Sequence, residues 1–438
     1  MAGAPRVWER AGMSTVTAAR PSIDAPDTDI SARSFWAQDF ETRDRIFARF
    51  RADCPVSWHR PYESELMPPD EDTAGFWSVW TYEDVRTVSR NAKLFCSGQG
   101  MLMEDFPEVV ATMSQSFLAM DDPEHAQLRA IVSQAFTPRR MRTIEGWIRE
   151  NVVHLADEMA HLGEGDFCEL FAKQVPGRIF ADFFGLPEGQ TREDVMDAAE
   201  KMLAWDDPEA AQGRDAIETY GEEAQRLLDI CFELIEERRA APGEDLLSWL
   251  VEAEYEGRKL EDWEIGSFFT LLAAAGNDTT RHSTAHAVHL LTTHPEQRAL
   301  LLEDLDGRID GAVEEILRYA SSVMQFRRTA TADTEISGVP IAKGEKVVMW
   351  YCSGNRDETV FPDAGRFDIT RESSSPHLGF GGGGPHYCMG AALGRLMLKH
   401  GLSELYTRMP DLMTGTPELQ VNNFIHGVRA LPAVWTPA

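Results

Sequence analysis

The chain has 438 residues, of which 43% are hydrophobic and 26% are charged. This composition is typical of a globular protein with a large core, and it excludes a disordered or collagen-like class for most of the chain. The formal net charge of −30 disfavours nucleic acid and anionic membrane surfaces as partners. No apolar run approaches the roughly 20 residues that a membrane-spanning helix needs, so we expect no binding to nucleic acid or a membrane.

Residues 1–33 are rich in Ala, Pro, Ser, Thr and Asp, which predicts a flexible N-terminal leader with Met13 as an alternative start. The first 20 residues lack the long apolar segment of a secretory signal, and the six cysteines show no framework spacing. Both features predict a cytoplasmic protein with free thiols.

Beyond the leader, the pattern alternates first in the manner of strands, then of helices, and then of strands again. Strand-like segments occur at about 34–90, at 327–352 and in the last 30 residues. Helical periodicity dominates from about 120 to 320 and again at about 389–408. We predict a mainly α fold with a smaller β portion, built as a single domain over residues 34–438.

The stretch from His377 to Gly390 holds six glycines around Cys388 and leads directly into a helix. Glycine permits close backbone approach, so the loop is shaped to lie against something flat or large. The helix N-terminus favours a thiolate, and a thiolate held by backbone N–H groups is what an axial haem ligand requires. Three alternatives are a dinucleotide-binding G-x-G-x-x-G, a zinc site with His377 and His386, and a flexible turn with a buried cysteine.

The longest helical pattern, 262–293, carries an acid and an alcohol near its middle. Ala275 and Gly276 leave room beside this helix, and the glycine can open its hydrogen-bond ladder. Asp278 and Thr279 are therefore candidate catalytic residues, because an acid and a hydroxyl beside a cavity can deliver protons. The alternative is a structural patch in which Thr279 bonds to the Ala275 carbonyl. Three histidines further along have a spacing that can chelate a metal, although packing or surface roles fit it better: His282, His286 and His289.

Two further pairs of residues have helical spacing. Glu315 and Arg318 are three residues apart, and Arg366 downstream can supply a second guanidinium. His125 and Arg129 are four residues apart on another helix. Alone, each pair is also compatible with an ordinary solvated ion pair or surface contact.

The combination is more specific than any part. In chain order the motifs are His125-x-x-x-Arg129, Ala275-Gly276-Asn277-Asp278-Thr279-Thr280, Glu315-x-x-Arg318, Asn355-Arg356-Asp357, Arg366-Phe367-Asp368 and the Cys388 loop. On these motifs the chain resembles the cytochrome P450 family over roughly residues 35–436. The resemblance implies a triangular helical prism with haem between the long central helix and the cysteine loop. It also implies a monooxygenase that inserts one oxygen atom of O₂ into a C–H bond of a hydrophobic small molecule.

The resemblance also implies roles for single residues. Cys388 is similar to the axial thiolate on the iron of haem b, and Asp278 and Thr279 to the acid–alcohol pair that relays protons. The positions similar to haem contacts are His125, Arg129, Arg328, Phe380, His386 and Gly390. The positions similar to a structural triad are Glu315, Arg318 and Arg366. Phe380 precedes Cys388 by eight residues instead of seven, which resembles a subgroup acting on sterols, terpenoids and long aliphatic chains.

Family position further implies a hydrophobic pocket for a terpenoid, steroid, alkyl or aromatic substrate. Its expected walls include Met101, Ala275, Val323, Met324, Phe326 and Ile425. The chain shows no flavin or iron–sulfur segment, so electrons are expected from a separate ferredoxin and an NAD(P)H-dependent ferredoxin reductase. A local basic docking patch is expected from Arg129, Arg139, Arg140, Arg142, Arg395 and Lys399. A peroxide-driven peroxygenase and a non-catalytic haem sensor are the alternatives.

Overall fold

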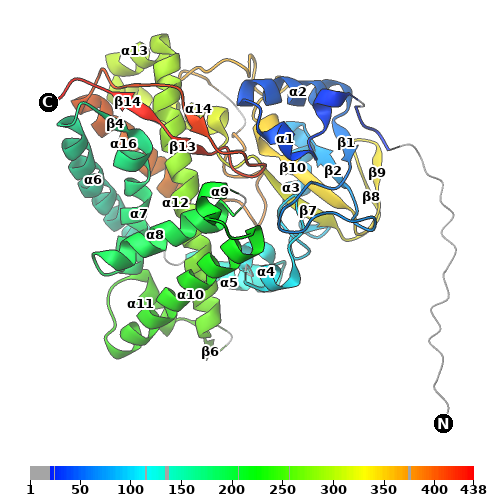
Figure 1. The fold of residues 1–438 in the computed structure, drawn as a ribbon, viewed down its shortest axis with the longest axis horizontal. Coiled ribbons are helices and arrows are strands. Elements are labelled where there is room, and N and C mark those ends of the chain that lie inside the picture. The colour runs from blue at the N-terminus through cyan, green and yellow to red at the C-terminus, as the bar shows by residue number, and fades with distance from the viewer. Residues whose placement is uncertain are drawn as a thin grey trace.

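The computed structural model describes residues 20–23, 25–113, 116–133, 138–205, 207–255, 257–372 and 376–438. Helices form the left and centre of the molecule, and a smaller lobe built on a β-sheet lies on the right (Figure 1). This arrangement confirms the prediction of a mainly α fold with a smaller β portion.

Helical elements occur along most of the described chain, and they are most closely spaced between residues 108 and 320. They are η1 (Pro26–Thr28), α1 (Arg33–Trp36), α2 (Phe40–Asp53), α3 (Tyr82–Arg90), α4 (Glu108–Met113), η2 (Phe117–Ala119), α5 (Glu124–Ser133), α6 (Pro138–Ala160), the π-helical turn η4 (Cys168–Ala172), α7 (Gln174–Phe184), α8 (Gln190–Leu203), α9 (Pro208–Ala211), α10 (Ala216–Ala240), α11 (Leu246–Glu252), α12 (Asp262–Thr293), α13 (Pro295–Glu303), α14 (Leu305–Ala320), α15 (Tyr351–Gly354) and α16 (Ala391–Arg408). The predicted helices at 262–293 and 389–408 are confirmed to within two residues.

Within the described residues, five strands form the main sheet in the order β1-β2-β10-β7-β3. Their bounds are Val56–His59, Phe76–Val79, Lys346–Trp350, Gln325–Ala330 and Phe95–Cys96. Strands β2 and β10 are parallel and the other neighbours are antiparallel. The short strands are β4 (Glu164–Asp166), β5 (Glu254–Tyr255), β6 (Arg258–Lys259), β8 (Thr334–Ile336), β9 (Val339–Ile341), β11 (Met413–Thr414), β12 (Glu418–Leu419), β13 (Val428–Ala430) and β14 (Pro432–Val434).

The region from 34 to 90 contains helices that the strand-like alternation did not predict. Asp39 caps α2 by accepting a hydrogen bond from the Thr42 backbone N–H. One face of α2 then buries Phe47 and Phe50 against Trp80, whose ring lies 5.1 Å and 4.6 Å from theirs. The alternation is confirmed at Phe76–Val79, which forms β2, whereas in α2 the aromatic residues lie on one buried helical face.

The predicted flexible leader is wrong for the last part of residues 1–33. Ile30 and Ser31 are fully buried, and the Arg20 guanidinium lies 3.5 Å from the centre of the Trp58 ring. Residues 1–19 lie outside the described residues. The chain therefore packs on the sheet lobe well before residue 34, because Ile30 supplies an apolar anchor there.

Helix α12 is the central element of the fold and positions the site (Figure 1). Glu261 and Glu264 form a capping box at its start, and its end at Thr293 precedes the pair His294-Pro295. Most of its residues are buried, as expected for a helix packed on several sides. It packs against α7, α8, α10, α14 and α16, so the cysteine loop that leads into α16 is brought to the same part of the fold.

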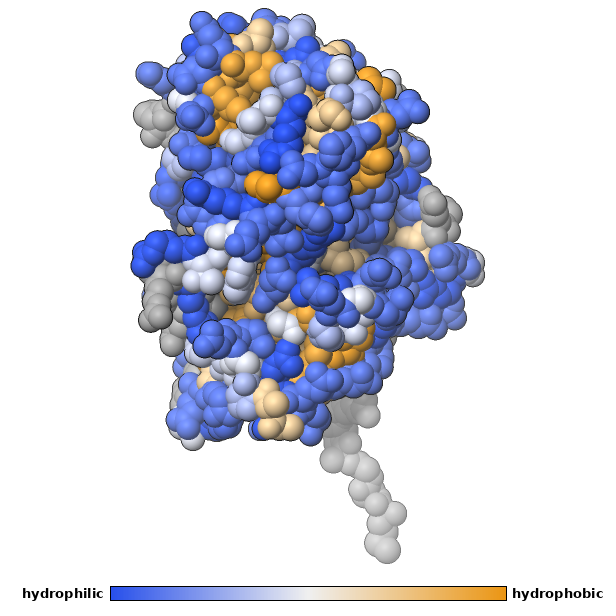
Figure 2. All heavy atoms as spheres, turned by 90° about the vertical axis from the view of Figure 1, so that its left-hand side faces the viewer, coloured by the Kyte–Doolittle hydropathy of each residue, from blue (hydrophilic) through white to orange (hydrophobic). Residues whose placement is uncertain are grey.

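The surface agrees with the strongly acidic composition. Figure 2 shows that the left-hand face of Figure 1 is mainly hydrophilic, with small separate hydrophobic patches. None of the helices in the described ranges combines the length and the apolar character that crossing a bilayer requires.

Candidate active site

Cys388 lies at the N-terminal end of α16, two residues before the cap Gly390. Its backbone N–H donates a 3.0 Å hydrogen bond to the Phe380 carbonyl, which closes the loop. Among the described cysteines, Cys388 is exposed and the other five are buried. The loop encloses one side of the sulfur, where burial raises the pKa of the thiol, while the Gly390 N–H and the charge of Arg129 oppose that rise. The residue is thus exposed on one face, and the Gly390 N–H, Arg129 and Arg395 partly offset the rise in the pKa of the thiol that burial causes.

The glycines of this loop are explained by packing on α3. Gly384 has φ +79, and a Cβ there would lie 2.5 Å from the Ser89 carbonyl oxygen. The Ser89 hydroxyl donates a 2.8 Å hydrogen bond to the Gly383 carbonyl. At these positions, therefore, the loop approaches helix α3 of the same chain closely.

Phe380 is held behind the sulfur loop by charged neighbours. The Arg395 guanidinium lies 4.5 Å from the centre of its ring, and the His377 ring lies 5.7 Å away. Glu314 accepts from Arg395 Nε at 2.5 Å and lies 3.2 Å from His377 Nε2. Burial would raise the pKa of Glu314, but His377 and Arg395 lower it to about 2. His377 therefore faces Glu314, and the described residues contain no group of three His, Cys, Asp or Glu residues able to hold a metal, so the zinc alternative loses support.

Four basic residues that are far apart in the sequence come together beside the loop. The rings of His125 and His386 lie 4.1 Å apart. Burial, Arg328, His125 and Arg129 together lower the pKa of His386 to about 2. Arg129 donates a 2.5 Å hydrogen bond to the Tyr387 carbonyl. Four of the predicted haem contacts thus form one cluster, whose positive charge comes from Arg129 and Arg328.

This cluster fits a group that brings carboxylates. His125 Nε2 and His386 Nδ1 are buried without a hydrogen-bond partner. Arg328 is also buried, and in the described ranges its guanidinium donates only to the Arg327 carbonyl, at 2.7 Å. Burial of a charge without a partner of opposite sign is costly. Two haem propionates would supply the missing acceptors, so the residues present fit haem, with Cys388 as its thiolate ligand.

We expect Arg328→Met to weaken haem retention. Loss of a charge-assisted hydrogen bond worth about 1.5–3 kcal/mol should make haem loss to an acceptor protein roughly tenfold faster or more. The matched control is Arg43→Met, because Arg43 is equally buried but packs on Trp36 and the Met324 sulfur. Equal rates of haem loss in the two variants would remove Arg328 from the haem contacts.

The middle of α12 has an open face. Ala275 and Gly276 are exposed although their neighbours on the helix are buried, and a Cβ at Gly276 would meet no atom within 4 Å. The half-buried Thr279 donates a 2.7 Å hydrogen bond to the Ala275 carbonyl. The helix is continuous through Gly276, so the predicted opening of its backbone hydrogen bonds is absent. The bond from Thr279 to the Ala275 carbonyl is the one expected if this polar patch is only structural. The room beside the helix is nevertheless present.

Asp278 is buried and lies among other charged groups. Its Oδ2 is 3.4 Å from His282 Nε2, and its Oδ1 is 3.7 Å from Arg281 Nη1. Arg281 in turn contacts Glu200 at 2.5 Å, and Glu200 contacts Lys173 at 2.7 Å. Burial would raise the pKa of Asp278, but His282, Arg281 and Lys173 outweigh it and hold that pKa below the ordinary value.

A small cavity borders Asp278 on the side of α8. Lys173, Glu200 and Arg281 line it together with Asp278 and the side chain of Asn277. Asn277 Oδ1 and Arg281 Nε are buried without a hydrogen-bond partner. Polar groups of this kind are commonly satisfied by an internal water molecule, which would lie beside Asp278.

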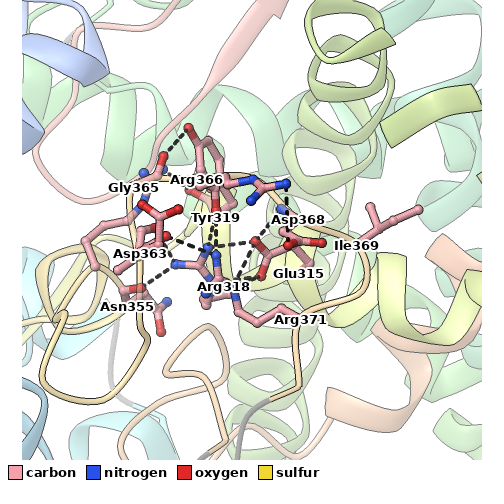
Figure 3. A network of polar contacts seen from close by, with 12 residues as sticks. Glu315, Arg318, Tyr319, Asn355, Asp363, Gly365, Arg366, Asp368, Ile369 and Arg371 are labelled. Atoms are coloured by element: carbon pink, nitrogen blue, oxygen red, sulfur yellow. Dashed lines mark hydrogen bonds and ion pairs between the residues drawn. The ribbon is translucent and has the colours of Figure 1, made fainter. Parts of the chain in front are cut away.

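The predicted structural triad needs one correction (Figure 3). Glu315 and Arg318 form a fully buried bidentate pair, with N–O distances of 2.7 Å and 2.8 Å. The second guanidinium on Glu315 comes from Arg371, whose Nε lies 3.1 Å from Oε2. The Arg366 side chain is 61% exposed and contributes its carbonyl, which accepts from both other arginines. The loop of residues 357–371 turns the Arg366 side chain outward, and Arg371 reaches back to Glu315 instead.

The predicted pocket residues divide into half-buried residues and core residues. Val323, Phe326 and Met101 are half-buried, and the Phe326 ring lies 5.2 Å from that of Phe424. Ile425 pairs with Val323 through a β-bridge and is 3% exposed. Met324 is fully buried in the aromatic cluster around Trp36 and Trp350, so its assignment to the pocket is wrong. Val323 lies in an isolated β-bridge before β7, whereas the next residue, Met324, packs in the aromatic cluster.

The predicted basic patch is partly neutralised. Arg395 is paired with Glu314, and Lys399 Nζ lies 2.7 Å from Asp310 Oδ1. Arg140 lies 5.6 Å from the centre of the Trp249 ring, whereas Arg142 is exposed. The Arg139 side chain lies outside the described residues. Of the five patch residues whose side chains are described, Arg395 and Lys399 are therefore paired with carboxylates of the chain.

Sequence reasoning missed three groups of residues near the site. Arg371 had no signal, because its distance from Glu315 in the sequence is long. Arg281 could have been found from its spacing of three residues from Asp278 on a helix. Arg327 and Lys346 both bind Asp105, which fastens the segment before α4 to the sheet.

Comparisons with known proteins agree with this geometry. The cytochrome P450 family model matches residues 81–408. A methyl-branched lipid omega-hydroxylase of Mycobacterium tuberculosis is 37% identical over 97% of this chain and 100% of its own length. A steroid C26-monooxygenase of Mycolicibacterium smegmatis is 36% identical over 83% of this chain and 84% of its own length.

Solved structures give the same result. A Mycobacterium marinum cytochrome P450 in complex with pseudoionone superposes with a TM-score of 0.91 and 45% identity, covering 95% of this chain and 100% of that one. The family model spans well over half of the chain and includes α12, the Glu315–Arg318 pair and the cysteine loop. With an open thiol at a helix N-terminus and a buried basic cluster beside it, this chain belongs to the cytochrome P450 family of monooxygenases, whose cofactor is haem.

Proposed function

We propose that the chain binds haem b through Cys388 and hydroxylates a long hydrophobic substrate of the methyl-branched lipid or terpenoid class. The observation that carries this proposal is the open face at Ala275 and Gly276, in the middle of a helix that is otherwise buried. A narrow end of an aliphatic chain fits beside two residues of minimal volume. The names of the relatives, a branched-lipid hydroxylase and a structure with an isoprenoid ketone, support the same class.

The walls of the pocket favour an apolar and flexible ligand. Phe326, Phe424 and Val323 present hydrophobic surface, and Leu271 and Leu272 of α12 are partly buried beside the open face. Burial of a methylene group is worth about 0.8 kcal/mol, so a long aliphatic chain gains affinity with each carbon it buries. None of these five side chains carries a charge that could bind a polar substrate.

When bound, haem supplies the activation of O₂ for insertion into a C–H bond. The residues of the chain would do the rest. Cys388 provides the thiolate, and His125, Arg129, Arg328 and His386 hold the propionates. The Thr279 hydroxyl borders the open face and can hold a proton there, and Asp278 can replenish it from the cavity lined by Lys173 and Glu200.

Substrate class is tested by titrating the haem-loaded protein and recording the shift of its absorption spectrum. The probes are a methyl-branched fatty acid, a linear fatty acid of equal length, pseudoionone and a steroid. We expect the branched acid or pseudoionone to bind at least about tenfold more tightly than the linear acid, in line with the value of buried methyl groups. Equal affinity for the linear acid, or preference for the steroid, would reject the proposed class.

The electron source is tested with the substrate that binds best. We propose a ferredoxin and an NAD(P)H-dependent ferredoxin reductase, and expect product with one atom of oxygen from ¹⁸O₂ only when both are present. Turnover with peroxide alone would favour a peroxygenase. Binding without turnover under either condition would favour a haem sensor.

We expect Asp278→Asn to lower product formation by about a hundredfold and Thr279→Ala to divert electrons to peroxide, because positioned acid groups contribute factors of this size. Product formed per NAD(P)H consumed measures the effect. The matched control is Thr284→Ala, since its hydroxyl bonds to the backbone four residues back at 2.8 Å but is buried away from the open face. If Thr284→Ala uncouples the enzyme as strongly, the effect at Thr279 reflects only the helix.

A further inference from the structure

His282 lies one helical turn beyond Asp278 on α12 and is fully buried. Its Nδ1 accepts a 3.0 Å hydrogen bond from the Val428 backbone N–H of β13. Its Nε2 lies 3.4 Å from Asp278 Oδ2, a contact that does not reach hydrogen-bond geometry, and it is buried with no hydrogen-bond partner. The ring therefore bridges a strand backbone and the buried acid.

The contact with Val428 determines where the ring carries its proton. A ring nitrogen that accepts an N–H hydrogen bond cannot itself be protonated, so the neutral ring must carry its proton on Nε2. Asp278 Oδ2, 3.4 Å away, is the acceptor within reach of this otherwise unpartnered N–H. An imidazolium would set two N–H donors against each other at Nδ1.

We infer that His282 is the positioning residue of Asp278, a neutral imidazole that donates from Nε2 to Oδ2 and orients the carboxylate. The inference rests on the proposed role of Asp278 in proton delivery. Arg281 Nη1 lies 3.7 Å from the other carboxylate oxygen and is held by Glu200. The carboxylate is thus fixed from two sides, with Arg281 on the side of the cavity and His282 on the side of β13.

The contact between His282 and Val428 also connects Asp278 to a wall of the proposed substrate pocket. Val428 follows Phe424 and Ile425 by only a few residues in the segment that pairs with Val323. The same backbone that supports the pocket wall therefore sets the tautomer of His282. The orientation of Asp278 depends on the place of β13 rather than on α12 alone.

Nitrogen NMR tests the tautomer directly. The protein is labelled with ¹⁵N-histidine and measured in the diamagnetic ferrous carbon monoxide form, with the His282 signals assigned by their loss in His282→Gln. We expect the shift of Nδ1 to be that of an unprotonated acceptor and the shift of Nε2 to be that of an N–H. A protonated Nδ1 would overturn the inference without bearing on the role of Asp278.

Coupling measurements test the function. We expect His282→Leu to lower product formed per NAD(P)H by about tenfold at unchanged KM, because general acid–base groups lose efficiency when misaligned. His282→Gln should restore most of it, since its amide can accept from Val428 and donate to Asp278. The control is His289→Leu, because His289 lies two turns further along and contacts Thr414 at 3.0 Å.

The outcomes separate the two proposals. If Asp278→Asn uncouples the enzyme and His282→Leu does not, the inference is overturned and the proton role of Asp278 stands. If Asp278→Asn itself leaves coupling unchanged, both are overturned. Should His282→Leu fail to fold, the tautomer and the coupling of His282→Gln still decide the matter, because a poorly coupled Gln variant would contradict a hydrogen-bonding role.

Discussion

Cys388→Ser is expected to abolish O₂-dependent product formation while the fold is kept. Its sulfur is the exposed thiol at the start of α16, and serine has nearly the same size but is a much weaker electron donor to iron. The absorption maximum of the ferrous carbon monoxide complex, which reports a thiolate ligand, should be lost. The basic cluster of His125, Arg129, Arg328 and His386 is untouched, so part of the haem should remain bound.

Cys54→Ser is the matched control for this experiment. Cys54 is buried near the end of α2, where burial raises the pKa of its thiol and makes it a poor ligand. This variant should retain the thiolate spectrum and turnover. A normal thiolate spectrum in Cys388→Ser would mean that another cysteine binds the iron, and the proposed site would be wrong.

Arg371→Ala is expected to destabilise the protein by about 1–3 kcal/mol, because Glu315 and two backbone carbonyls lose charge-assisted hydrogen bonds while the Glu315–Arg318 pair remains. Arg371 is 11% exposed and binds Glu315 as well as the carbonyls of Pro362 and Arg366. The midpoint of thermal unfolding of the haem-loaded protein measures the loss. Substrate affinity should change little in the fraction that remains folded.

Arg366→Ala distinguishes the observed triad from the predicted one. Its side chain is mainly exposed and lies 3.9 Å from Asp368, so its removal should cost no more than about 0.5 kcal/mol. A larger loss for Arg366→Ala than for Arg371→Ala would restore the sequence-based assignment. Glu315→Gln should resemble Arg371→Ala or exceed it, since both arginines then lose their carboxylate.

The motifs were predictable because each concerns residues close together in the sequence. The spacing of Glu315 and Arg318 gives their pairing directly, and the glycines around Cys388 mark a loop before a helix. Which of Arg366 and Arg371 binds Glu315 was not predictable, because it depends on the direction in which the loop of residues 357–371 turns. Both residues are arginines with equal chemistry, and only the three-dimensional path of residues 362–371 separates them.

The burial of Met324 and the tautomer of His282 could not be predicted from the sequence either. Met324 and Val323 are both apolar neighbours, and only the pairing of Val323 with Ile425 decides which one lies toward the pocket. The bridge from Val428 through His282 to Asp278 joins residues nearly 150 positions apart. Such contacts arise from packing of α12 against the C-terminal strands, which no local pattern encodes.

At Gly276, the stability of the helix and the volume of the space beside it can be changed independently. Alanine is favoured over glycine inside a helix by up to about 1 kcal/mol, and an added methyl group here would clash with nothing within 4 Å. In the proposed function, the same methyl would occupy volume that the end of the substrate enters. Regioselectivity is therefore expected to respond to Gly276→Ala, a change that should leave the scaffold as stable as before, or more so.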